Sequence, residues 1–402
     1  MKKNIKKISA AVLAAAMLLT FSGCGDNSST NDTPNNVDNE TTTAAEAEPS
    51  ASVVNDEIRD IPSIELVKEI KVGWSLGNTL DAYDSELGHQ DVSSETCWGN
   101  PVTTKEMFTA VKDAGFNIVR IPVTWYNHMD ENNNVDAEWM DRVQEVVDYA
   151  YSQDMFVILN IHHEDWHDPY YDTADASIEK LKALWTQIGN RFAGYDEHLI
   201  FEGLNEPRKR NTGMEWNGGD KEGHDVVNQM NAAFVETIRG LKGNNPKRHL
   251  MLPTYAASTT TGAINDYAMP EGDDKLIVSV HAYTPYGFAL SDDLNDRNFT
   301  PDEGNANDII YLMDLLKTSF IDKGIPVIIG EFGARSKGNV AERAEWAEYY
   351  ISKASELGIP CLWWDNGAFT GTGENFGVLD RKLNVWKFQE IIQGLMQGLE
   401  DR

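Results

Sequence analysis

The sequence predicts an α/β protein whose folded part is a single (β/α)8 barrel, the TIM-barrel architecture. Three observations predict this fold. Eight short apolar runs of strand length recur between about residue 60 and the C-terminus. Helical patterns fit between most of these runs, so strands and helices alternate. Each run is almost continuously apolar, as expected for strands of a parallel sheet that is covered by helices.

The apolar runs and the residues that end them define the expected strands. Pro207 cannot donate a hydrogen bond within a sheet, so the fourth strand should end before it. An open, doubly wound sheet is the competing fold, but residues 73–78 do not match the GxGxxG turn that would favour it. In chain order the predicted strands are 72–76, 118–122, 156–161, 199–204, 250–253, 276–281, 326–330 and 360–364.

Helices are predicted from capping residues and from apolar residues at helical spacing. Thr103 and Glu106 have the spacing of a capping box before a helix over 107–114, and Gly115 is a C-terminal stop. The same periodicity predicts helices near 140–150, 230–241, 340–357 and 386–395. The segment after the fifth strand gives the weakest helical pattern.

The N-terminus has the pattern of an export signal over residues 1–24. A charged stretch is followed by an apolar stretch too short to span a bilayer comfortably. Phe21-Ser-Gly-Cys24 resembles the cleavage box of bacterial lipoproteins, although Phe21 stands where Leu is usual. We therefore expect an exported protein, extracellular or at the cell surface, that contacts a membrane only through a lipid on Cys24.

The next segment, 25–59, is predicted to be a disordered acidic linker, and residues 60–402 to be the folded domain. Residues 25–58 contain no Lys or Arg and few large apolar side chains, so they cannot bury enough surface to offset their ordering entropy. Cys97 lies in a polar stretch and Cys361 at the start of a strand, and we expect no disulfide between them.

The net charge of −30 argues against nucleic acid as a partner, because phosphate binding needs clustered Lys and Arg. A neutral glycan would not be repelled. The sequence has no CxxC and no Cys/His cluster with metal-ligand spacing, so we expect neither a metal nor another cofactor. We expect a monomer.

Polar side chains follow the C-terminal ends of most predicted strands. These ends meet at one face of a barrel, where barrel enzymes carry their catalytic residues. The candidates are Arg120, His162, His163, Asn205, Glu206, His281, Tyr283, Glu331 and Trp364. Each has an alternative explanation: Glu206 or Glu331 could cap a helix or pair with a buried arginine, Arg120 could form a structural ion pair, and Trp364 could be core.

Two carboxylates at one barrel face suit glycoside hydrolysis. One protonates the leaving oxygen, and the other attacks the anomeric carbon or activates water. Arg120 and Tyr283 can hold one carboxylate ionised, and Asn205 can bind the sugar 2-hydroxyl. The histidines can bond sugar hydroxyls and the acid, and Trp364 offers a flat face to a pyranose ring. A metal site at His162 and His163 with His167 and Asp168 is disfavoured, because adjacent histidines on a strand end should point to opposite sides.

The motifs that carry these residues resemble glycoside hydrolase family 5, most closely its bacterial endo-β-1,4-glucanase (cellulase) branch, over about residues 60–398. Ser75 stands where that branch often has Asn, and Cys97 where Ala is common. The motifs are Gly73-Trp-Ser-Leu-Gly-Asn-Thr-Leu-Asp81, Glu95-Thr-Cys-Trp-Gly-Asn-Pro101, Arg120-Ile-Pro-Val-Thr-Trp125, Asn160-Ile-His-His163, Leu204-Asn-Glu-Pro-Arg208, His281-Ala-Tyr283, Gly330-Glu-Phe-Gly333 and Trp363-Trp-Asp-Asn-Gly367.

This resemblance implies that 60–402 is a retaining catalytic domain, with Glu206 as acid/base and Glu331 as nucleophile. Glu206 should feel less positive charge than Glu331, and its pKa should be the higher one. The resemblance also implies that His163 contacts a sugar on the non-reducing side of the scissile bond and that Asn78 reaches further out. Arg120, His162, Asn205, His281, Tyr283 and Trp364 would complete the site.

The implied substrate is a β-glucan, cleaved at internal β-1,4-glucosidic bonds. The same mechanism with a preference for xyloglucan, mixed-linkage β-glucan, xylan or mannan is the alternative. A glycan-binding surface lipoprotein without activity is a further alternative, but it would be expected to have lost a catalytic carboxylate. A metal-dependent hydrolase on a similar fold would need His and Asp ligands from several strands.

Overall fold

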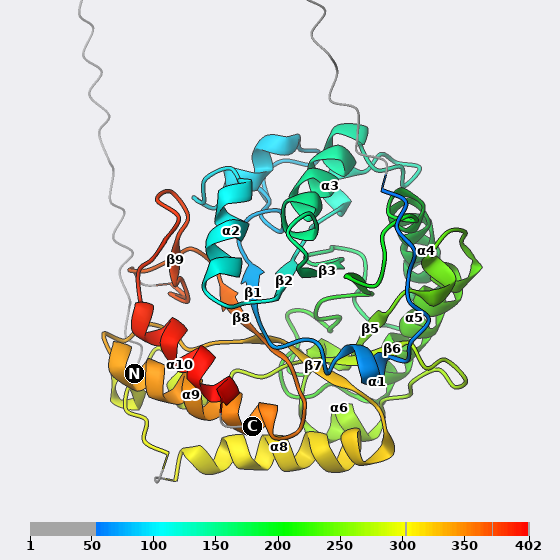
Figure 1. Cartoon of the computed structure of the whole chain (residues 1–402). Helices are drawn as coiled ribbons and strands as arrows, with labels where there is room; N and C mark the ends of the chain where they lie inside the picture. Colours follow the sequence, from blue (N-terminus) through cyan, green and yellow to red (C-terminus); the bar gives the residue numbers. More distant parts are fainter. Residues whose placement is uncertain (1–53, 302–303, 372, 401–402) are drawn as a thin grey trace, which may run out of the picture. The chain divides into compact units, whose positions relative to one another are not determined.

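The computed structural model describes residues 54–301, 304–371 and 373–400, and its centre is a closed barrel of eight parallel strands in sequence order (Figure 1). The predicted fold class is therefore confirmed, and each predicted strand is present within a few residues of its expected bounds. The strands are β1 (Val72–Leu76), β2 (Ile118–Ile121), β3 (Phe156–Asn160), β4 (Leu199–Glu202), β5 (Leu250–Pro253), β6 (Leu276–His281), β7 (Val327–Phe332) and β8 (Cys361–Asp365).

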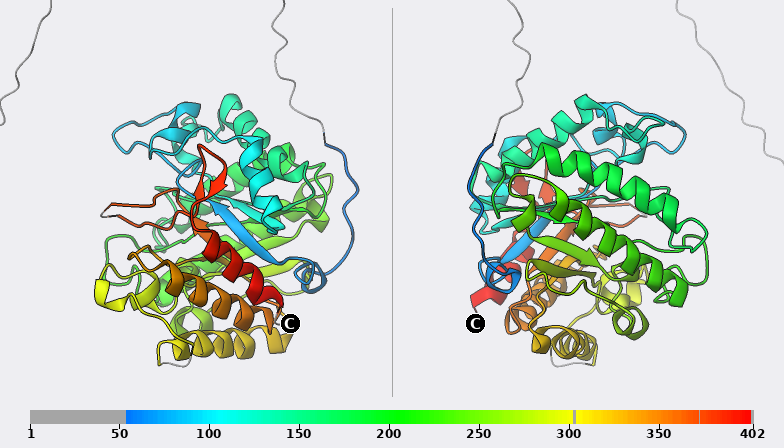
Figure 2. Two further views of the ribbon diagram at one scale, coloured as in Figure 1. Left: turned by 60° about the vertical axis from the view of Figure 1, so that its left-hand side comes forward. Right: turned by 90° about the vertical axis from the view of Figure 1, so that its right-hand side faces the viewer.

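Helices surround the barrel, and α10 lies along α9 beside β1 (Figures 1 and 2). The long helices are α2 (Lys105–Asp113), α3 (Ala137–Tyr151), α4 (Ala174–Arg191), α5 (Lys221–Gly240), α8 (Ala306–Ser319), α9 (Val340–Ser355) and α10 (Gln389–Glu400). The short ones are α1 (Ser63–Leu66), α6 (Thr261–Asn265) and α7 (Tyr286–Ala289). The weak helical pattern after the fifth strand thus corresponds to a helix of only five residues, α6.

Two local predictions about helix ends are wrong. The residue that caps α2 is Thr104, and the backbone N–H of Thr103 donates to Glu95, at 2.7 Å, so no capping box forms with Glu106. The last helix begins at Gln389 rather than at Trp386. Trp386 instead belongs to β10 (Val385–Trp386), which pairs with β9 (Leu379–Asp380) in a two-stranded antiparallel sheet.

The strand sequences divide the barrel interior into an apolar layer and a polar layer. The apolar layer includes Ile118, Ile158, Ile200, Ile277, Ile328 and Leu362, which form one buried cluster with Leu66 of α1. Side chains two residues apart on a strand share a face. Arg120, Asn160, Glu202, Ser279 and Trp364 therefore face the same way one step nearer the C-terminal ends, and this is the layer on which the site is built.

The predicted boundary between linker and domain at residues 59 and 60 is too late. Ile58 is 5% exposed, and Arg59 donates its backbone N–H to Glu197, at 2.9 Å. The backbone N–H of Asp56 donates to Gly194, at 2.8 Å. Residues 54–59 therefore belong to the folded domain. The predicted signal segment, Cys24 and the rest of the linker lie outside the described residues.

Cys97 is exposed and Cys361 is buried, and both are free thiols. Within the described part of the chain, no helix is long and apolar enough to cross a membrane.

Candidate active site

Arg120 lies at the centre of the polar layer and is fully buried. Its Nε donates to Glu202, at 2.7 Å, its Nη1 donates to Glu331, at 2.7 Å, and its Nη2 donates to the Oδ1 of Asn205, at 2.6 Å. The pKa of Arg120 is raised, because the charges of Glu202 and Glu331 outweigh its burial. One guanidinium therefore fixes side chains from β4, from the segment after β4 and from β7.

Glu331 receives a second hydrogen bond, from the hydroxyl of Tyr283, at 2.9 Å. The register of β6 and β7 places His281 opposite Glu331, with a register shift between Val280 and His281. Gly330 leaves room for this arrangement, because a Cβ at that position would lie 3.2 Å from the Nε2 of His281. Glu331 therefore accepts hydrogen bonds from both Arg120 and Tyr283.

Glu206 lies across from Glu331 and is held by different partners. Its Oε1 is 2.8 Å from the Nδ1 of His281, and its Oε2 is 3.7 Å from the Nη1 of Arg208. The ligand atoms of Glu206, His281 and Glu331 all lie within 4.8 Å of one another. The two carboxylates predicted from strand ends, 125 residues apart in sequence, are thus brought together.

The prediction that the pKa of Glu206 is raised is wrong for this structure. Burial opposes its ionisation, but the hydrogen bond from His281 and the charges of His281 and Arg208 outweigh burial and lower the pKa. The pKa of His281 is raised, because the charge of Glu331 and the bond to Glu206 outweigh its burial. The proton is therefore held by the Glu206–His281 pair, a coupled unit whose macroscopic pKa values belong to both groups.

The two adjacent histidines lie side by side rather than pointing apart. The ring centroids of His162 and His163 are 4.3 Å apart. Their Nε2 atoms lie 4.0 and 3.9 Å from the Oδ2 of the buried Asp81. Burial lowers the pKa of both histidines, that of His163 to about 4, and raises the pKa of Asp81 to about 6. The structural reason given against a shared ligand is therefore wrong.

Two groups of side chains are spaced closely enough to hold a metal ion at this face. They are Asp81 with His162 and His163, and Glu206 with His281 and Glu331. In the second group, Glu331 already accepts a hydrogen bond from the cationic Arg120. The absence of a metal requirement stays a prediction.

Trp364 and Asn78 border the same face. The Trp364 indole stacks on His162 with centroids 5.7 Å apart and planes 8° apart, and it is 7% exposed. Gly77 allows this packing, since a Cβ there would lie 2.7 Å from the indole. Asn78 follows β1 in a left-handed conformation, and its carbonyl accepts from Asn100, at 2.8 Å. All ten predicted site residues of the folded domain therefore lie at or beside the C-terminal ends of the strands.

Glu202 and its partner Ser279 were missed from the sequence. Glu202 is buried and accepts from Arg120, from Ser279, at 2.6 Å, and from Asn160, at 3.0 Å. A charged residue inside the apolar run of β4 was the available signal, because such a residue is costly unless it is paired. Trp98 is 40% exposed and lies 5.7 Å from His163, whereas Trp125 is core.

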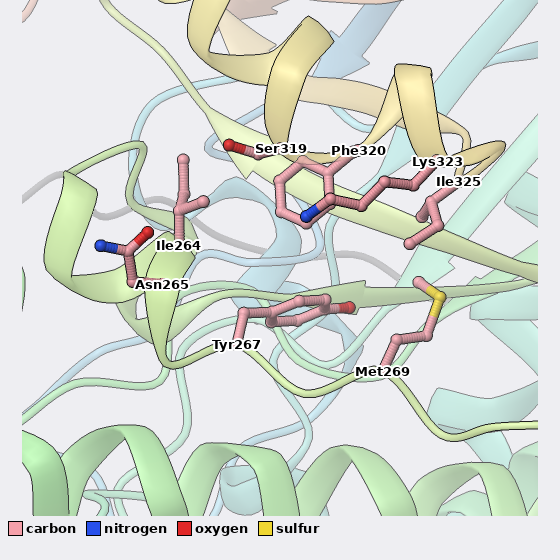
Figure 3. Close-up of a pocket in the computed structure, with 8 residues that line it drawn as sticks. All are labelled: Ile264, Asn265, Tyr267, Met269, Ser319, Phe320, Lys323 and Ile325. Carbon is pink, nitrogen blue, oxygen red and sulfur yellow. The ribbon is translucent and has the colours of Figure 1, made fainter.

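A cavity of about 190 Å³ lies elsewhere on the domain, between α6 and the end of α8 (Figure 3). Ile325 lines it just before β7 begins, so the cavity is at the N-terminal side of the strands, away from both carboxylates. Its lining contains no carboxylate: Ile264, Asn265, Tyr267, Met269, Ser319, Phe320, Lys323 and Ile325.

Comparison with known proteins identifies the family. Residues 80–370 match the model of "Cellulase (glycosyl hydrolase family 5)". The chain belongs to glycosyl hydrolase family 5. The prediction of an enzyme of the endo-1,4-β-glucanase (cellulase) class is confirmed by this assignment.

Relatives within glycosyl hydrolase family 5 cover nearly the whole described domain. Endoglucanase B of Neocallimastix patriciarum is 48% identical over 85% of this chain and 73% of its own length. A GH5-4 broad specificity endoglucanase from Clostridium longisporum is 46% identical, with a TM-score of 0.82 over 86% of this chain and 99% of that one. The GH5-4 broad specificity endoglucanase from Ruminococcus champanellensis, solved with bound cellotriose, is 45% identical. Its TM-score is 0.82, and the match covers 85% of this chain and 100% of that one.

Proposed function

We propose that the protein is a retaining endo-β-1,4-glucanase in which Glu331 is the nucleophile and Glu206 is the acid/base. The observation that carries this proposal is the spacing of the two carboxylates, with oxygen atoms within 4.8 Å of each other. Retaining enzymes hold their carboxyl groups about 5–5.5 Å apart, whereas inverting enzymes leave about 6.5–9.5 Å for a water molecule. The close approach of the two carboxylates fits the retaining range better than the inverting range and therefore supports double displacement.

The partners of each carboxylate support the assignment of roles. Glu331, oriented by hydrogen bonds from Arg120 and Tyr283, attacks the anomeric carbon. Glu206 shares a proton with His281 and gives it to the leaving oxygen as the glycosidic bond breaks. In the second step Glu206 takes a proton from water, whose oxygen displaces Glu331 from the sugar.

The remaining residues of this face are proposed to bind the sugar. The Oδ1 of Asn205 is held by Arg120, which leaves its amide nitrogen to donate to the 2-hydroxyl. Trp364, which stacks on His162, contacts the pyranose with the small part of its indole that stays exposed. His163, next to the exposed Trp98, contacts the sugar on the non-reducing side, and Asn78 contacts one further out.

The substrate is proposed to be a cellulose-type β-1,4-glucan. The cellotriose in the Ruminococcus champanellensis relative supports a glucan, and the broad specificity named for two relatives keeps xyloglucan, mixed-linkage β-glucan, xylan and mannan as alternatives. A reducing-sugar assay across these polysaccharides tests the substrate. Proton NMR of the first products tests the mechanism: we expect β-configured products, and α-configured products would rule out double displacement.

We also propose that the mature protein is a monomer anchored at the cell surface by a lipid on Cys24. The apolar stretch before Gly23-Cys24 supports this placement. In a bacterial host, the wild-type protein should sediment with membranes, and Cys24→Ala should move most of it to the soluble fraction. Equal membrane partitioning of the two proteins would contradict the anchor.

A further inference from the structure

Arg208, two residues after Glu206, contacts the candidate acid/base in two ways. Its Nη1 donates to the backbone carbonyl of Glu206, at 3.0 Å, and lies 3.7 Å from the carboxylate Oε2. Its Nε donates to Glu215, at 3.2 Å, and Glu215 accepts in turn from the backbone N–H of Asn211, at 2.8 Å. The guanidinium is therefore fixed from two sides, and a planar fork suits this task better than the point charge of a lysine.

The same guanidinium covers one face of Trp216. The Cζ of Arg208 lies 4.2 Å from the centroid of the indole ring, within the range of a cation–π contact. Trp216 is nevertheless 58% exposed, so its other surface is open to solvent. An exposed indole that is held in one orientation costs little entropy when a flat apolar surface binds it. The C–H face of a pyranose is such a surface.

The position of Trp216 relative to Glu206 decides which part of a glycan it meets. The acid/base protonates the oxygen of the leaving group, so the leaving sugar lies on the side of Glu206. The guanidinium of Arg208 contacts both Glu206 and Trp216, so it links the indole to the side of Glu206. His163 and Trp98, which contact each other, belong instead to the segments that follow β3 and β1.

We propose that Trp216 binds the sugars of the leaving group and that Arg208 is a positioning residue that joins this binding surface to Glu206. The proposal rests on the proposed function, because it needs Glu206 to be the acid/base. The segment after β4 would then both donate the proton, through Glu206, and bind the leaving sugars, through Trp216, and Arg208 contacts both side chains. A glycan bound on Trp216 would therefore lie against the indole that packs on Arg208, the residue that orients Glu206.

The charge of Arg208 should affect the pH dependence of activity, which a purely structural role for Arg208 would leave unchanged. Arg208 is one of the charges that lower the pKa of Glu206. Removing it should let the Glu206–His281 pair keep its proton to higher pH, so the alkaline limb of the activity profile should move up. Other charged or titratable groups acting on Glu206 would remain: His281, His163, Glu331, Tyr283 and Glu374.

The first test compares Trp216→Ala with Tyr311→Ala, a matched control on the outer surface of α8, where Tyr311 is 63% exposed. On cellopentaose labelled at its reducing end, Trp216→Ala should move cleavage toward that end, because fewer sugars are held beyond the scissile bond. Its kcat/KM should fall about tenfold on cellopentaose, and much less on an aryl β-cellobioside that has no leaving sugar. Tyr311→Ala should change neither quantity.

The second test compares Arg208→Met with Arg208→Lys in the pH dependence of kcat/KM on cellopentaose, whose leaving sugar needs the proton of the Glu206–His281 pair. Arg208→Met should move the alkaline limb upward by about half a pH unit or more, whereas Arg208→Lys should keep it near the wild-type position. Trp216→Phe and Arg208→Lys are the variants to use if a larger change prevents folding.

Three results would overturn the proposal. They are an unchanged cleavage pattern in Trp216→Ala, equal losses on both substrates, or an alkaline limb that stays in place in Arg208→Met. A wild-type enzyme that cleaves no β-glucan would instead overturn the proposed function, and the inference with it.

Discussion

Glu331→Ala is expected to lower kcat/KM on cello-oligosaccharides by about 10⁵-fold, because no other carboxylate can form the glycosyl–enzyme bond. The fold should survive, since Arg120 keeps its hydrogen bonds to Glu202 and Asn205. The substitution leaves a small space next to Arg120 and Tyr283, two donors that have lost their acceptor. That space suits a small anion.

Azide should therefore restore turnover of Glu331→Ala on an activated aryl glycoside. Because azide attacks the anomeric carbon from the side of the missing carboxylate in a single displacement, the product should be the α-glycosyl azide. Formate offers a second anion of suitable size. A β-glycosyl azide from this variant would mean that Glu331 is not the nucleophile and that the roles of the two glutamates are exchanged.

Glu206→Ala is expected to give a loss that depends on the leaving group. Proton transfer by a positioned side chain contributes about 10²–10⁴-fold, so hydrolysis of cello-oligosaccharides should fall by about that factor. Glycosyl transfer from aryl glycosides with acidic phenols should be nearly unaffected, because these leaving groups need no proton. Here azide should yield the β-product, since it attacks the intermediate that Glu331 still forms.

The pH profile adds an independent check on Glu206. In the wild-type enzyme acting on cello-oligosaccharides, the alkaline limb is expected to mark the loss of the proton shared by Glu206 and His281, and the raised pKa of His281 should move that limb to higher pH. In the residual hydrolysis of cello-oligosaccharides by Glu206→Ala, this limb should disappear while the acidic limb remains. A persistent alkaline limb in Glu206→Ala would show that another group supplies the proton.

The strand ends could be predicted from sequence because each was marked by a local change from apolar to polar residues. Arg120, Glu206, His281 and Glu331 were found in this way. Barrel closure then required these ends to meet, so their proximity followed from the fold class alone. Their hydrogen-bond partners could not follow, because partner choice depends on register and side-chain direction.

Three groups of residues show what the local sequence pattern could not predict. Glu202 lies inside an apolar run and was taken with its strand, although its charge makes it the second counter-ion of Arg120. The proximity of Asp81 to His162 and His163 depends on how the segment after β1 folds back over β3. The expected pKa of Glu206 was wrong because the hydrogen bond and charge of His281, together with the charge of Arg208, outweigh burial. Arg208 is a neighbour in sequence that was not recognised as a neighbour in space.

The double attachment of Arg120 has a consequence for the covalent intermediate of the proposed mechanism. Once Glu331 carries a sugar as an ester, it no longer carries a negative charge. A buried guanidinium that lost its only counter-ion would be destabilised by about 3–5 kcal/mol. Glu202 remains bound to Arg120, at 2.7 Å, and is fully buried with it. The charge of the arginine thus stays balanced throughout the catalytic cycle, and the intermediate forms without leaving an isolated cation in the barrel.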